Sequence, residues 1–302
     1  MSVQLSKTEQ VKVRLEKEKP RLVNLQKDAQ VIVRQYSLDG EVVRVVLVLD
    51  ASGSMRNQYN GGRVQLVVDR MTTVALNFDD NGELEVWGYA SGHAKLPVIT
   101  LENLDTYVRE VMAGRAPVVT PAPTPAPAPK PKKGWLGRLG DLISGGDDSS
   151  AASTTPQPVR GQWGRWGDGI LPGLSYDNNE PPVMKAILED SKSTPNTPTL
   201  VIFVTDGGID KGESIKKVLV EASRFPIFWQ FVGIGGSSYG VLEDFDTMEG
   251  RYVDNANFFA LDDIESISVK ELYSRLLGEF PSWLEKVRKI GMIPPAASAS
   301  GK

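Results

Sequence analysis

The chain contains no cysteine and only one histidine, His93, among its 302 residues. The absence of cysteine excludes disulfide bonds, zinc–thiolate sites and thiol nucleophiles. We expect His93 to be a surface residue on an edge strand, so triad chemistry lacks a base as well as a thiol. No G-x-x-x-x-G-K-S/T stretch occurs, which excludes a P-loop nucleotide site. These absences favour a binding protein over an enzyme.

Apolar runs long enough to span a membrane are also missing. No window approaches the ~20 apolar residues that a membrane-spanning helix needs, and MSVQLSKTEQ at the start has no apolar stretch of signal-peptide length. The formal net charge of -4 argues against a general nucleic-acid binder, because such proteins are usually basic. We therefore expect a soluble cytoplasmic protein with no nucleic-acid partner.

Strand-like and helix-like patterns alternate along most of the chain. Nearly continuous apolar runs, typical of strands covered on both faces, are EVVRVVLVLD (41–50), PTLVIFVTDGG (198–208) and PIFWQFVGIGG (226–236). Further strands are predicted at ELEVWGYA (83–90), at its antiparallel edge neighbour HAKLPVIT (93–100) and at NFFAL (257–261). Helical spacing predicts helices at 62–78, 101–112, 180–190, 211–224 and 268–289. The alternation predicts an α/β fold: doubly wound, with a mostly parallel central sheet flanked by helices and one antiparallel edge strand.

Three segments lie outside this alternation. Residues 1–41 form an N-terminal extension with a helix at about 20–37, and the charged start fits either a strand or an exposed helix. The main domain is predicted at 42–292, and residues 114–167 interrupt it as a low-complexity insertion. Within this insertion, APVVTPAPTPAPAPKPKK favours an extended polyproline spacer. The composition of residues 293–302 predicts a disordered tail.

A short amphipathic helix is predicted inside the insertion, at 134–143. Its apolar residues fall on one face; they are Trp135, Leu136, Leu139, Leu142 and Ile143. A tethered helix of this kind is suited to a membrane surface or to a groove on a partner. The alternatives are that it folds back on its own domain or remains a weakly helical part of the linker.

Oxygen-bearing side chains follow two of the predicted central strands. VVLVLDASGSM brings Asp50 to the end of one strand and places Ser52 and Ser54 on the next loop, and FVTD brings Asp206 to the end of another. In an open parallel sheet, ligands bind beyond the carboxyl ends of the strands. Hard oxygen donors suit Mg²⁺, Mn²⁺ or Ca²⁺ and do not suit zinc or copper. Turn and helix-cap roles are the alternative for these residues.

DASGS (50–54) and TDGG (205–208) carry a resemblance to the von Willebrand factor A (vWA) family, whose motif is D-x-S-x-S. The resemblance runs from residue 42 to about residue 277, apart from the insertion. It implies a metal-ion-dependent adhesion site (MIDAS) in which Ser52 and Ser54 bind the metal directly. Asp50 and Asp206 would usually bind it through waters.

The threonine that the family adds to this site has no counterpart here. The corresponding stretch is LSYDNNEPPVMKAILED (174–190), and alignment on PPVM puts Asn178 in the position of the threonine. An amide oxygen is also a neutral hard donor, so metal binding is retained. Asp177 and Ser175 are alternative ligands, and an N-cap role is the alternative for Asn178.

Several stretches narrow the resemblance to the A-domain proteins of bacterial tellurium-resistance clusters (TerF-like). They are LDGEVVRVVLVLDASGSM, FDDNGELEVWGYA, YDNNEPPVM and ELYSRLLGEFPSWL. The resemblance implies a metal-dependent adhesion or scaffold module in tellurite and metal-stress resistance. Its protein partner, for instance another tellurium-resistance protein, would complete the metal coordination with an acidic residue. The implied location is cytoplasmic, and contact of the insertion helix would make it peripheral to the inner membrane.

A metal-dependent hydrolase, for instance a phosphatase, is the alternative function. The D-x-S spacing resembles the D-x-D of some phosphatases, but Ser52 stands where the second acid would be. The site then lacks a general acid beside the nucleophile, so we expect no enzymatic activity.

Overall fold

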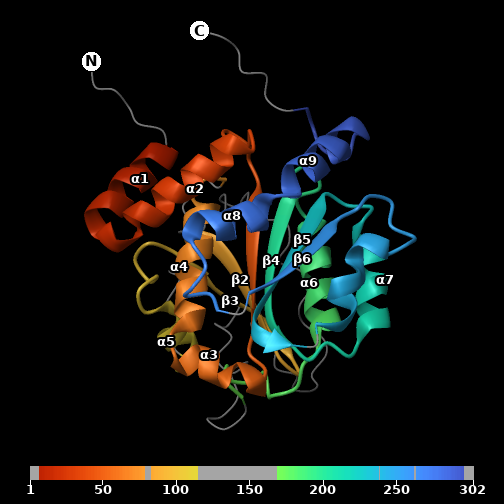
Figure 1. Ribbon diagram of the computed structural model, residues 1–302, viewed down its shortest axis with the longest axis horizontal. Coiled ribbons are helices and arrows are strands. Elements are labelled where there is room, and N and C mark those ends of the chain that lie inside the picture. Colours follow the sequence, from red (N-terminus) through yellow and green to blue (C-terminus); the bar gives the residue numbers. More distant parts are fainter. Residues whose placement is uncertain (1–6, 79–82, 115–168, 238, 262, 296–302) are drawn as a thin grey trace, which may run out of the picture. The chain divides into compact units, whose positions relative to one another are not determined.

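Six strands form one sheet in the order β3-β2-β1-β4-β5-β6 in the computed structural model (Figure 1). The strands are β1 (Arg44–Asp50), β2 (Leu84–Tyr89), β3 (His93–Ile99), β4 (Thr199–Gly207), β5 (Ile227–Ser237) and β6 (Ala256–Leu261). Every neighbouring pair is parallel except β2 and β3. The predicted fold class is therefore confirmed. The structure describes residues 7–78, 83–114, 169–237, 239–261 and 263–295.

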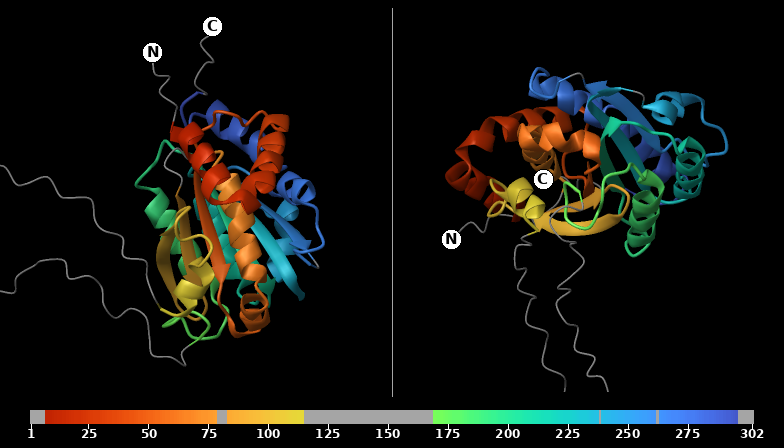
Figure 2. Two further views of the ribbon diagram at one scale, coloured as in Figure 1. Left: turned by 90° about the vertical axis from the view of Figure 1, so that its left-hand side faces the viewer. Right: turned by 90° about the horizontal axis from the view of Figure 1, so that it is seen from below.

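Helices cover both faces of this sheet (Figures 1 and 2). They are α1 (Lys7–Glu18), α2 (Val23–Gln35), α3 (Arg56–Asn60), α4 (Arg63–Ala75), α5 (Tyr107–Met112), α6 (Glu180–Ser191), α7 (Gly212–Ala222), α8 (Val269–Leu277) and α9 (Phe280–Lys289). Val45 and Leu47 of β1 pack in one core with α2, α4, α8 and α9, whereas Val46 and Val48 pack in a second core with α6 and α7. Successive strand residues point to opposite faces, so a strand covered on both sides reads as a continuous apolar run.

The N-terminal helices share the first of these cores. Leu15 of α1, and Ile32 and Val33 of α2, are buried in the same cluster as the strand residues, and α2 packs against α4 and α8. Helix α2 follows a 3₁₀ turn at Pro20–Leu22 and ends at Gln35. The start of the chain, which fitted a strand or a helix, is helical over Lys7–Glu18.

The helices of the structure differ from the predicted helices at two places. The helix predicted at 101–112 begins only at Tyr107, because the Asn103 side chain accepts a hydrogen bond from Thr100 N and donates one to Val98 O. Such side-chain bonds offer the backbone an alternative to a helix. Helix α3 and the 3₁₀ turn before it (Gly53–Met55) were not predicted. The helix predicted at 268–289 is divided into α8 and α9, and Pro281 lies in the first turn of α9.

Some predictions fall outside the described residues. They include the polyproline spacer, the helix at 134–143 with its five apolar residues, and most of the C-terminal tail. His93, at the start of β3, is exposed and its ring stacks on Trp87. Among the described helices, none has the length and apolarity required to cross a membrane.

Candidate metal centre

The candidate centre lies where the strand order reverses. Strands β1 and β4 are neighbours, but the chain continues from β1 towards β2 on one side and from β4 towards β5 on the other. Such a reversal leaves a crevice at the carboxyl ends of the strands. Asp50 is the last residue of β1 and Asp206 is the penultimate residue of β4, so the two acids predicted from separate motifs meet at one edge of the sheet.

Three hydrogen bonds fix the Asp50 carboxylate, which is 0% exposed. Oδ2 accepts from the Tyr89 hydroxyl at 3.0 Å and from Thr205 Oγ1 at 3.1 Å, and Oδ1 accepts from Ser52 N at 2.8 Å. Burial raises the pKa of Asp50 to about 6, although the hydrogen bonds from Ser52 and Tyr89 favour its charged form. The negative charge of Asp206 is a smaller cause of the same rise in pKa. Asp50 therefore anchors the loop that carries the two serines.

The serine hydroxyls and Asp206 form a continuous row of oxygens. Ser52 Oγ lies 3.0 Å from Ser54 Oγ, and Ser54 Oγ donates to Asp206 Oδ1 at 3.0 Å. Burial raises the pKa of Asp206, while the Ser54 hydrogen bond opposes this. Adjacent ligands of an octahedral Mg²⁺, each ~2.1 Å from the ion, are about 3.0 Å apart. The observed spacing of these oxygens thus fits the edges of a hard-cation site.

Asn178 lies on a third segment, which is tied to both motif loops. Its Nδ2 donates to Gly207 O at 2.7 Å, and two residues earlier Tyr176 O accepts from Gly53 N at 2.8 Å. The N-cap of α6 is Asn179 and not Asn178, so the capping role is wrong for Asn178. Its Oδ1 is buried and has no hydrogen-bond partner among the described residues. An unpaired buried amide oxygen on a side chain tied to Gly207, the residue after Asp206, fits the role of a metal ligand.

The two alternative ligands on this segment are placed differently. Asp177 is exposed, its Oδ2 accepts from Ser91 Oγ at 3.1 Å, and its backbone N donates to the same hydroxyl. Ser175 is exposed, has a positive φ of 64°, and forms a β-bridge with Gly169. Both side chains are exposed, whereas the Asn178 amide oxygen is buried and its nitrogen bonds to Gly207, the residue after Asp206, so the geometry favours Asn178.

Three residues around the site were not anticipated. Tyr89 and Thr205 hold Asp50, and Glu180 is a buried acid at the start of α6. In the sequence, Glu180 followed by two prolines has the pattern of an ordinary first helical turn. Among the described residues, no three His, Cys, Asp or Glu side chains come together closely enough to hold a metal. The centre therefore depends on hydroxyl and amide oxygens as well as on acids.

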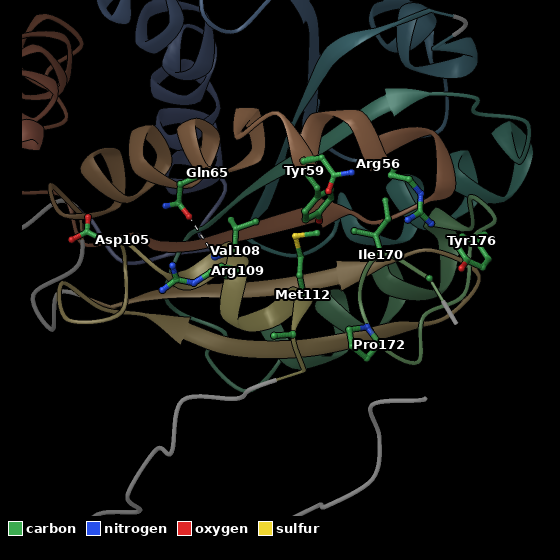
Figure 3. A pocket seen from close by; sticks show the side chains of 13 residues that line it. Arg56, Tyr59, Gln65, Asp105, Val108, Arg109, Met112, Ile170, Pro172 and Tyr176 are labelled. Atoms are coloured by element: carbon green, nitrogen blue, oxygen red, sulfur yellow. Dashed lines mark hydrogen bonds between the residues drawn. The ribbon is translucent and has the colours of Figure 1, made fainter. Parts of the chain in front are cut away.

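A pocket of about 650 Å³ opens beside the serine loop (Figure 3). Arg56, which follows the serine loop directly, and Tyr176 both line it, and the guanidinium of Arg56 lies 5.8 Å from the Tyr176 ring centroid. Apolar side chains such as Val108, Met112 and Ile170 form much of the remaining wall. The pocket thus gives the surface next to the candidate centre a concave, largely apolar area.

One protein family and one relative match most of the chain. Residues 42–124 and 156–293 match the family described as the vWA domain found in the TerF C terminus. The uncharacterized protein YcbR of Bacillus subtilis (strain 168) is 33% identical over 288 residues, which is 93% of this chain and 95% of that protein.

Solved structures show a more distant similarity. Proximal thread matrix protein 1 from the mussel byssus matches 78% of this chain at 13% identity, with a TM-score of 0.42. A structure of the same protein with a zinc-occupied MIDAS motif matches at 14% identity, with a TM-score of 0.40. This chain spans about half the length of each, 47%.

The family match covers the sheet, both strand-end motifs and the segment that carries Asn178. The insertion accounts for the unmatched stretch between residues 124 and 156. The chain therefore belongs to the TerF-like family of vWA domains.

Proposed function

We propose that the chain is a divalent-metal-dependent protein-binding module that acts in a bacterial tellurite or metal-stress response and is not an enzyme. The observation that carries the proposal is the convergence of Ser52, Ser54 and Asp206 oxygens at 3.0 Å spacings. Ser52 and Ser54, together with Asn178, would hold Mg²⁺, Mn²⁺ or Ca²⁺. Asp50 and Asp206 would complete the site directly or through waters.

The neutral donors in this set favour binding of an acidic partner. Two hydroxyls and an amide do not cancel the charge of a divalent ion, so a bound cation would supply positive charge that attracts a carboxylate. A partner's acidic side chain is thus the natural last ligand. The pocket next to the serine loop supports a protein partner, because protein interfaces combine apolar anchors with a polar rim.

The hydrolase alternative finds little support at the site. Position 52 is a serine, and the nearest second acid, Asp206, accepts a hydrogen bond from Ser54. Peripheral contact with a membrane through the helix at 134–143 remains a prediction, because that segment lies outside the described residues.

Titration calorimetry with Mg²⁺, Mn²⁺ and Ca²⁺ tests the metal site. Wild type is expected to bind one ion with modest affinity, because Mg²⁺ keeps several waters. Ser54→Ala should weaken binding without unfolding, since Ser54 is exposed. Ser193→Ala is the matched control, because Ser193 is exposed and its hydroxyl bonds only to Asp190 O on α6. If no ion binds to folded wild type at millimolar concentration, the proposal is wrong.

Binding to purified candidate partners from tellurium-resistance clusters tests the second half of the proposal. Binding should require the metal, disappear with a chelator, and weaken in Ser54→Ala but not in Ser193→Ala. Equal binding with metal and with chelator would contradict metal-dependent adhesion even if the ion itself binds.

A further inference from the structure

Glu180 is a buried acid whose carboxylate has no partner. It is the first residue of α6 and is 0% exposed, and neither Oε1 nor Oε2 has a hydrogen-bond partner among the described residues. Burying a carboxylate without hydrogen bonds or a cation is strongly unfavourable. Either protonation of the carboxyl or a group outside the described residues must therefore offset this cost.

A role in the first helical turn does not explain this burial. Acids favour helix N-termini because of the partial positive charge there, and Glu213 of α7 and Glu271 of α8 occupy comparable positions. Their side chains are 82% and 51% exposed. A favourable helix-end position thus leaves an acid free to remain in water, whereas Glu180 is withdrawn from water.

The charged groups around Glu180 do not neutralise it either. Lys211 is the neighbouring cation, but its Nζ donates to Asn178 O at 2.9 Å and to Asn179 Oδ1 at 3.1 Å. The other charged neighbours that influence Glu180 are Asp50 and Asp210, and both repel a carboxylate. The carboxylate therefore lies close to the candidate centre and adds negative charge to it.

We propose that Glu180 belongs to the metal centre and accepts hydrogen bonds from waters bound to the divalent cation. We place this contact through water because, among the described residues, no three acids come close enough to one another to hold one ion. Hydrated Mg²⁺ retains several waters, whose hydrogens need acceptors, and Glu180 offers two unused oxygens. This inference rests on the proposed function, and it adds to that site a residue outside the D-x-S-x-S motif.

Calorimetric titration of the full chain with Mg²⁺ and with Mn²⁺ tests the inference on Glu180→Gln. Removing a group that orients a metal site typically weakens metal affinity about 10–100-fold, and we expect a loss in this range. Glu189→Gln is the matched control: it makes the same change on the same helix, at a side chain that is 65% exposed, and should leave the affinity unchanged.

A second measurement separates the role of Glu180 from a general loss of structure. Thermal unfolding in chelator should show Glu180→Gln to be at least as stable as wild type, because the amide removes a buried charge. If this variant does not fold, Glu180→Asp keeps the charge but shortens its reach, and should still bind Mg²⁺ more weakly than wild type.

The outcomes distinguish this inference from the function on which it rests. If wild type binds Mg²⁺ and folded Glu180→Gln binds it equally well, the role of Glu180 is overturned while the metal site stands. Equal affinity in Glu180→Asp would overturn it in the same way. If wild type itself binds no ion, the proposed function fails first.

Discussion

Asn178 is the residue that the alignment on PPVM places where the family resemblance predicts a threonine. Its Nδ2 is used to hold Gly207 O, which leaves Oδ1 buried and unpaired. A threonine would offer a hydroxyl at this place, whereas a carboxamide can offer either its oxygen or its nitrogen unless one of them is held elsewhere. The hydrogen bond to Gly207 therefore orients the amide as well as fastening the segment.

We predict that Asn178→Ala weakens Mg²⁺ affinity about tenfold, the lower end of the usual range for a residue that shapes a metal site. Ser175→Ala should have a smaller effect, because Ser175 is exposed and bridges to Gly169. Asn179→Ala is the matched control; its side chain bonds to Lys211 and to Ser91 O. Calorimetry that finds Ser175→Ala more damaging than Asn178→Ala would show the alignment on PPVM to be wrong.

Residues of the site differ in how well the sequence could predict them. Asp50 and Asp206 were predictable, because each ends an apolar run whose strand identity is clear. Tyr89 could not be assigned, since its contact with Asp50 depends on β2 pairing with β1 so that these two residues face each other. Glu180 was missed because its burial depends on how α6 packs, and no local pattern of residues records that.

At the scale of elements, one cluster of charges links three strands to a helix. Arg44 of β1 donates to both Glu85 oxygens at 2.6 and 2.7 Å and also to Asp190 of α6. Lys95 of β3 lies 2.9 Å from Glu85 and 3.4 Å from Asp190. These residues lie at the opposite end of β1 from the metal centre, so they affect stability without touching the site.

Glu85 makes the stability of this cluster depend on pH. Burial alone would raise its pKa, but the hydrogen bonds and charges of Arg44 and Lys95 outweigh burial and lower the pKa to about 2. Because the pKa of Glu85 is lower in the folded protein than its unfolded value of 4.5, the ionised carboxylate stabilises the folded protein at pH above 4.5. That contribution is lost as the pH falls through the window from 4.5 to about 2.

We predict that Glu85→Gln lowers the free energy of unfolding at pH 7 by about 2 kcal/mol, and that this difference from wild type shrinks towards pH 3. Urea unfolding at both pH values measures the effect. Glu213→Gln, at an 82% exposed side chain, is the matched control and should change little. A difference between Glu85→Gln and wild type that stays constant or grows on acidification would contradict the assigned role of Glu85.

Strands and helices could be predicted where the pattern of apolar residues that marks them is long. The central strands could be predicted because burial on both faces leaves almost no polar residue in the run. Helix α3 has only five residues, too few to show a helical period, and it is set by the tight turn after Ser52. The late start of α5 depends on Asn103, whose side chain competes with helical hydrogen bonds.

At the scale of the whole molecule, residues 1–117 and 163–302 form one compact unit, apart from 118–162. Gly114 and Pro172, which lie on either side of residues 115–168 in the sequence, are close together on that unit, since a Cβ on Gly114 would lie 3.4 Å from the Pro172 side chain. Both cores are built from residues on either side of the insertion. The described residues on both sides of the insertion thus supply the two cores of the sheet.

We predict that a variant lacking residues 118–162 folds with a melting temperature at or above that of wild type. Shortening the connection several-fold lowers the entropy cost of closing it by about 1–2 kcal/mol. Mg²⁺ affinity should be unchanged, because Ser52, Ser54, Asn178 and Asp206 all lie in the retained unit. Scanning calorimetry and metal titration measure both quantities on the same sample.

The same deletion removes Trp135, Leu139 and Ile143, so it also tests the predicted helix at 134–143. If that helix contacts a partner or a membrane, the variant binds purified partners or anionic liposomes more weakly while its metal affinity stays at the wild-type level. A second variant with Ser in place of the five apolar residues keeps the length of the insertion and should behave in the same way. If both variants bind like wild type, the helix has no role in contact. A melting temperature well below that of wild type in the deletion variant would instead show that the unit depends on its insertion.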